Sequence, residues 1–82
     1  MNREWILANL HEAREELNSI LAAFESLETY EEAAFEIDIA HVYSHLNVAW
    51  NARNIDRERA AGHTTADYYE WCGFPTDISI TP

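Results

Sequence analysis

Three residues in the middle of the chain have the types and the spacing of metal ligands. Asp38, His41 and His45 follow the pattern D-x-x-H-x-x-x-H, which places them along one side of a helix. Two imidazoles four residues apart can chelate one ion, and a carboxylate one turn earlier is a suitable third ligand. Glu16 comes level with His41 if two helices form a hairpin here. The pattern indicates a candidate site for a divalent transition metal.

The same residues also fit a structural role. The H-x-x-x-H spacing of metalloproteases has a glutamate directly after the first histidine, and Val42 stands there in this chain. Histidines on a half-buried helix face also pair with nearby carboxylates without any metal. A structural ridge of histidines and carboxylates is therefore the alternative interpretation.

A second polar pattern follows along the same predicted helix. Asn47, Asn51 and Asn54 step by four and three residues, and Trp50 and Arg53 flank them. Asparagine is a poor helix former, so three on one face indicate a purpose other than helix stability. Amides, a guanidinium and an indole together suit a small anion or a partner peptide. The interpretation is a polar binding stripe; the alternative is that these amides bind the backbone of a C-terminal segment folded back over them.

Nothing in the sequence indicates nucleophilic catalysis. Cys72 lies among aromatic residues near the end of a predicted helix, whereas a reactive thiolate favours a helix N-terminus. With two glycines, the chain has no glycine-rich phosphate loop. We therefore expect a protein without catalytic activity of its own.

The elements that must position these residues are helical. Apolar residues repeat at spacings of four and three in a first helix over about residues 3–27, and again in a second over about 30–60. Asn2 is the expected N-cap of the first helix, and Thr29 with Glu32 fits a capping box for the second. The short turn between them predicts an antiparallel hairpin, with one long kinked helix as the alternative.

A third, short helix is expected over about residues 65–72, after an N-cap at His63–Thr65 and before Gly73 and Pro75. Its aromatic residues would cover one end of the hairpin, and residues 76–82 form an extended or flexible tail. The fold class is thus all-α, in one domain of residues 1–82. Two helices cannot bury two broad apolar faces against each other alone. We therefore predict that two hairpins form a homodimeric four-helix bundle.

Composition limits the partners. Fifteen acidic side chains against five arginines give a net charge of −10, which disfavours direct binding to nucleic acid or to an anionic membrane. Six acids and no basic residue lie between Glu25 and Asp38, around the expected turn. This acidic tip is either a solvated surface, a docking site for a basic protein or, least in keeping with the rest, a mimic of nucleic acid.

The expected function is therefore a small, acidic, non-catalytic module for protein interaction or regulation. A single cysteine and no apolar leader favour the cytoplasm. The alternative function is a metal-binding helical bundle that uses Asp38, His41, His45 and Glu16.

Overall fold

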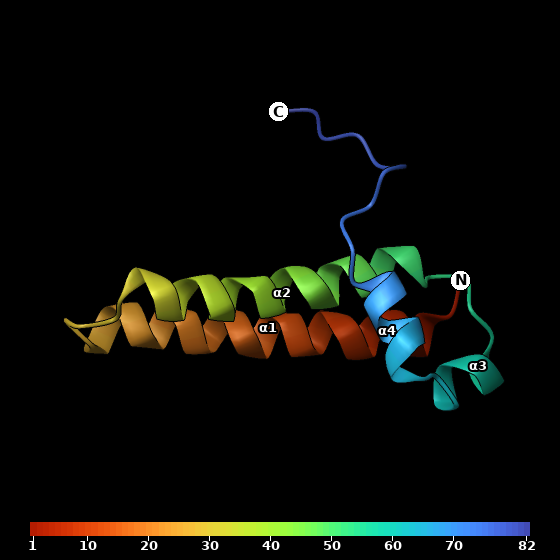
Figure 1. Ribbon diagram of the computed structural model, residues 1–82, viewed down its shortest axis with the longest axis horizontal. Helices are drawn as coiled ribbons and strands as arrows, with labels where there is room; N and C mark the ends of the chain where they lie inside the picture. The colour runs from red at the N-terminus through yellow and green to blue at the C-terminus, as the bar shows by residue number, and fades with distance from the viewer.

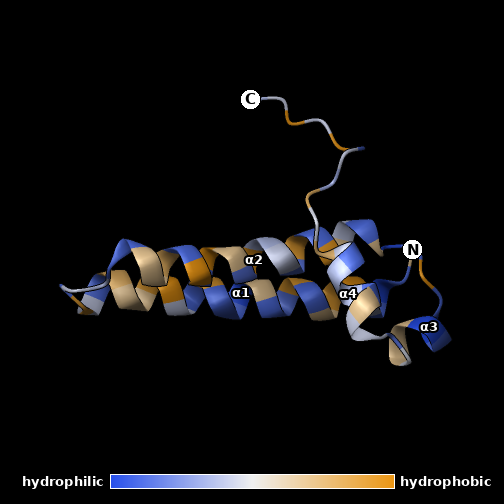
Figure 2. Ribbon diagram, viewed as in Figure 1, coloured by the Kyte–Doolittle hydropathy of each residue, from blue (hydrophilic) through white to orange (hydrophobic).

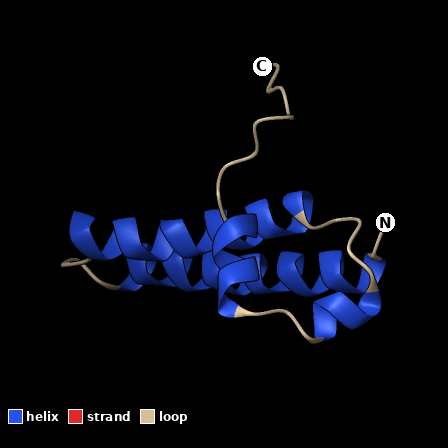
Figure 3. Cartoon of the chain, turned by 45° about the vertical axis from the view of Figure 1, so that its right-hand side comes forward, coloured by secondary structure: helices blue, strands red, loops and turns tan.

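The computed structural model describes all residues 1–82 and is entirely helical. Its elements are α1 (Arg3–Ser26), α2 (Glu32–Asn51), α3 (Arg57–Ala61) and α4 (Thr65–Trp71). The long helices α1 and α2 lie side by side and antiparallel, and α3 and α4 sit at the end of the hairpin that holds the N-terminus (Figure 1). Figure 3 shows the same arrangement without any strand. The predicted hairpin and the short C-terminal helix are confirmed.

Helix α1 begins where its sequence predicts. The Asn2 side chain accepts a hydrogen bond from the backbone N–H of Trp5 at 3.1 Å, which satisfies one of the free donors of the first turn. The same side chain donates to the carbonyl of Ile55 at 3.1 Å, and the Asn2 backbone N–H donates to the carbonyl of Arg53. Asn2 thus caps α1 and also fixes the chain that follows α2.

These contacts explain why the second helix is shorter than predicted. The expected helix over 30–60 was wrong at its C-terminal end, because α2 stops at Asn51 and a separate helix, α3, starts at Arg57. The backbone between them turns to meet Asn2, and Asp56 then caps α3 by accepting from the N–H of Arg59 at 2.7 Å. Asp56 is a sequence signal for this second start.

The start of α2 also differs from the sequence prediction. Thr29 and Glu32 form no capping box; the N-cap is Glu31, and its side chain makes no capping hydrogen bond. Tyr30 stays outside the helix, where its ring packs edge-on against Phe24 and Phe35 and its hydroxyl bonds to Asp38. These contacts hold the turn in a longer loop. The chain's one complete capping box joins Thr64 and Asp67 at the start of α4.

The core is thin and divided in two. Ala13, Ile20 and Val42 form one buried cluster between the long helices. Val48, Ala52 and Trp71 form the other, at the end that α4 covers. Only ten residues of the chain are buried, so much of the apolar seam predicted for each long helix remains in contact with solvent.

Candidate interaction surface

The histidine ridge does not assemble into a ligand set. Asp38 accepts a hydrogen bond of 2.5 Å from the hydroxyl of Tyr30, and this bond, with burial, raises the pKa of Tyr30 to about 12. Nδ1 of His45 lies 3.3 Å from Oδ1 of Asn9. His41 is exposed. The structure contains no group of three His, Cys, Asp or Glu side chains placed to hold a metal ion. Asp38, His41, His45 and Glu16 are therefore not brought together.

Asn9 is the polar residue that the sequence analysis missed. It is buried on α1, where its amide donates to the carbonyl of Trp5 at 3.0 Å and its oxygen faces His45. The bond across the hairpin needs the His45 tautomer with hydrogen on Nδ1. The available signal was a short amide within an apolar seam, which indicates a specific partner across the helix interface.

The asparagine stripe faces the C-terminal segment. Asn47 donates to the carbonyl of Cys72 at 2.9 Å, and Asn51 donates to the carbonyls of Trp71 and Gly73 at 2.8 and 2.7 Å. These bonds satisfy carbonyls at the end of α4, which the helix itself leaves without partners. Asn47 and Asn51 thus fit the alternative interpretation of the stripe, in which the amides bind the backbone of the C-terminal segment. Asn54 is exposed and makes no such bond.

This difference gives a matched pair of variants. Asn51→Ala should lower the free energy of unfolding by about 1–2 kcal/mol, because two carbonyls of the α4 terminus lose their donor. Asn54→Ala, three residues away, should change it by less than about 0.5 kcal/mol. Urea unfolding followed by circular dichroism measures both. Equal effects of the two substitutions would show that the Asn51 bonds do not hold α4.

Trp50 and Arg53 hold the start of the tail. The Trp50 indole donates to Asp77 at 2.8 Å, the Arg53 guanidinium lies 3.8 Å from the same carboxylate, and Arg53 stacks 3.9 Å over the Trp50 ring. The bond from Trp50, together with the charge of Arg53, lowers the pKa of Asp77 below its ordinary value. The stripe residues Trp50 and Arg53 therefore already bind an anion, the Asp77 carboxylate of their own chain.

An uncovered apolar surface runs along one side of the hairpin. We call it the apolar flank. The α1 residues of the flank are four, seven, four and three positions apart, a spacing that keeps them on one side of the helix. The adjacent edge of α2 completes the flank. A pocket of about 300 Å³ joins the two helices there, lined among others by Leu10, Leu46 and Trp50. The flank consists of Ile6, Leu10, Leu17, Leu21, Phe24, Ile39, Leu46 and Trp50.

Most of these side chains are exposed, including four on α1: Leu10, Leu17, Leu21 and Phe24. Hydrophobic stretches recur along both long helices in Figure 2, although the hairpin has no further layer packed along its length. Helix α4 does not cover the flank, because its contacts are with Ser44, Asn47, Val48 and Asn51. A contiguous apolar surface of this kind usually marks a protein contact.

Charge is distributed unevenly along the hairpin. The acidic tip carries six acids from Glu25 to Asp38, and none forms an ion pair within the chain. The opposite end carries Arg3, Arg53, Arg57 and Arg59. Arg3 and Arg14 also form no ion pair within the chain, and they lie seven residues before and four after Leu10, on the side of the flank. Each hairpin thus has a strongly acidic tip and an opposite end at which four arginines nearly offset the acids.

Comparison of the chain with models of protein families, with curated proteins and with solved structures found no match. None of the helices has the length and apolar character needed to span a membrane.

Proposed function

We propose that this protein is a non-catalytic interaction module that acts as a homodimer. In the dimer, the apolar flank of each hairpin packs against the flank of a second copy, and the four long helices form one bundle. The observation that carries the proposal is the row of leucine and phenylalanine side chains on α1, each of which is more than 40% exposed. The cytoplasm is the proposed location, because the one cysteine, Cys72, has no partner for a disulfide.

The thin core of the single chain is an argument for a second layer of helices, supplied by another copy. A chain of this length buries only about 60% of the surface exposed by its unfolded form, so its stability on its own is marginal. Burial of a leucine side chain contributes about 1.5–3 kcal/mol, and the flank offers several leucines on each copy. Because these leucines are 41–56% exposed, roughly half of that contribution remains for the association of two copies.

The charges favour a second copy in the antiparallel orientation. Turned end to end, two hairpins bring each acidic tip beside the arginine-bearing end of the other copy. A parallel arrangement would instead place two acidic tips together, and like charges in contact oppose association. The antiparallel orientation avoids this repulsion, and we propose it for a second copy of this chain as the occupant of the flank.

Sedimentation equilibrium of the wild-type protein tests the proposal. At concentrations of tens of micromolar we expect a species of twice the 9.5 kDa chain mass. The dimer should dissociate only on dilution, and the melting temperature of the protein should rise with its concentration because dimerisation stabilises the folded state. A single species of 9.5 kDa throughout this range would refute the proposed function.

A further inference from the structure

The C-terminal residues 78–82, which we call the arm, form an extended segment that takes no part in the helical fold. Ile78 is 48% exposed and Ile80 is 91% exposed. No hydrogen bond or ion pair joins any side chain of the arm to the helices. The arm has no helix or strand, and it extends away from both long helices in Figure 1. Two isoleucines in so exposed a segment indicate that another surface buries them.

The pattern of the arm suits an apolar surface. Ile78 and Ile80 alternate with Ser79 and Thr81. In an extended chain, alternate side chains point to the same side, so both isoleucines face one way and the hydroxyl groups face the other. Such a segment can lie flat with one side buried and the other in water.

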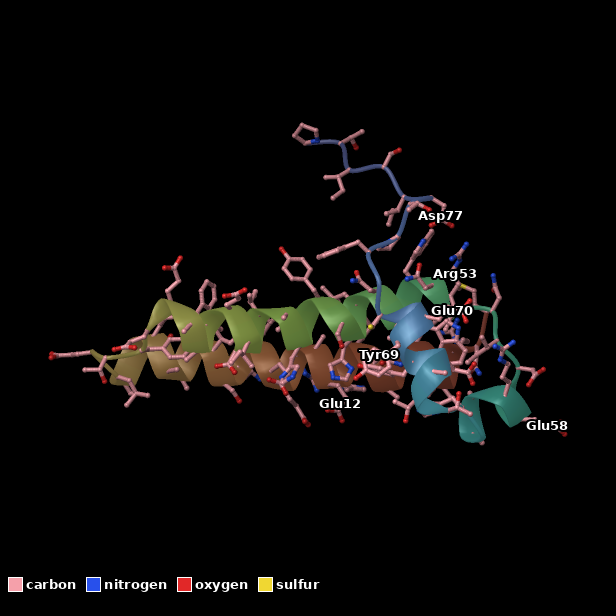
Figure 4. All side chains as sticks on the ribbon, in the orientation of Figure 1. Glu12, Arg53, Glu58, Tyr69, Glu70 and Asp77 are labelled. Carbon is pink, nitrogen blue, oxygen red and sulfur yellow. The ribbon has the colours of Figure 1, made fainter.

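The base of the arm is fixed at the edge of the apolar flank. Asp77 is held by Trp50 and Arg53, which also line the apolar pocket between α1 and α2. Figure 4 shows Asp77 and Arg53 where the tail leaves the helices. Phe74 packs against Tyr43, about two turns of α2 before Trp50, with ring centroids 5.3 Å apart. The arm therefore starts beside the surface that the second copy covers in the proposed dimer.

We propose that the arm packs on the second copy of the chain, with Ile78 and Ile80 buried against the first turns of the other α2, on the flank side that carries Ile39. This inference rests on the proposed dimer. In the antiparallel arrangement the acidic-tip end of one hairpin lies beside the Trp50 end of the other, so the start of the other α2 is the surface within reach. Five residues span about 16 Å when extended, which is enough to cross one helix.

Two variants test the arm. Replacing both isoleucines by serine, Ile78→Ser with Ile80→Ser, should raise the dissociation constant of the dimer at least about tenfold, because each dimer loses two such arms. The control, Ser79→Ala with Thr81→Ala, changes the opposite side of the same arm. It should change the dissociation constant of the dimer less than threefold, since these side chains stay in water. Sedimentation equilibrium gives the dissociation constant of the wild type and of both double variants.

Photo-cross-linking identifies the contact itself. A benzoylphenylalanine placed at position 80 of the full chain should give a product of dimer mass, with the cross-link mapped to the first half of α2. A product of monomer mass alone would mean that the arm folds onto its own chain and would overturn the inference. A wild-type dimer whose dissociation constant is unchanged by the two serine substitutions would overturn it too, with the proposed function intact. A monomeric wild-type protein would refute both.

Discussion

Leu17→Asp should convert the dimer into a monomer at micromolar concentrations. Leu17 is 41% exposed and lies on the apolar flank of α1, so the substitution leaves the buried cluster of Ala13, Ile20 and Val42 unchanged. In the proposed antiparallel dimer Leu17 lies at the middle of the flank, so the two new carboxylates would be buried close together among apolar side chains, at a cost of several kcal/mol. We expect the dissociation constant to rise at least about a hundredfold in sedimentation equilibrium.

Ile37→Asp is the matched control. Ile37 is 62% exposed, and it precedes Leu46 by nine residues, which is about two and a half turns of helix. It therefore lies on the opposite side of α2 from the flank. The substitution adds the same charge and removes a similar exposed apolar side chain, yet it should leave the dissociation constant within about threefold of the wild type. Equal weakening by both variants would mean that net charge, and not the flank, controls association.

Trp71→Ala should have the largest effect on folding. Trp71 is 7% exposed; it packs with Val48 and Ala52 and meets Trp5 edge-on at 6.1 Å. Truncation of a buried tryptophan costs about 3–5 kcal/mol, whereas a chain of this length has a total stability on the order of 4–12 kcal/mol. We expect much of the stability to be lost, with α4 no longer held against α2. Thermal unfolding at a fixed protein concentration measures this change.

Tyr69→Ala provides the comparison within the same helix. Tyr69 is 74% exposed, so most of its side chain is in contact with solvent. Its removal should change the free energy of unfolding by less than about 0.5 kcal/mol. If Trp71→Ala were as mild as Tyr69→Ala, then α4 would not be part of the core. The buried cluster around Val48 would in that case contribute little to stability.

The sequence was sufficient for the hairpin because its signals are local. The apolar spacing on both long helices, the cap at Asn2 and the glycine and proline after Trp71 each act within a few residues. The end of α2 was not predictable in the same way. It depends on Asn2, which bonds to Arg53 and Ile55 from more than fifty positions away. Long-range contacts of this kind override the tendency of a helix to continue.

The candidate sites show the same difference between local sequence signals and long-range contacts. Spacing alone placed Asp38, His41 and His45 on one side of a helix, but their partners come from elsewhere: Tyr30 for Asp38 and Asn9 for His45. The asparagines of the stripe were singled out correctly as unusual in a helix, and two of them serve the carbonyls of the α4 terminus. The sequence predicted surplus apolar surface, because two helices have only one interface between them, but it did not predict which residues form the flank.

The most direct test of the dimer is an isotope-filtered nuclear Overhauser experiment on a mixture of labelled and unlabelled protein. We expect contacts between copies from the methyl groups of Leu17 and Leu21, at the middle of the apolar flank. Contacts from Leu10 to the Phe24 ring of the other copy are also expected, as the antiparallel orientation requires. Contacts between copies that arise only from α3 or α4, or none from the flank at concentrations of hundreds of micromolar, would contradict the proposed dimer.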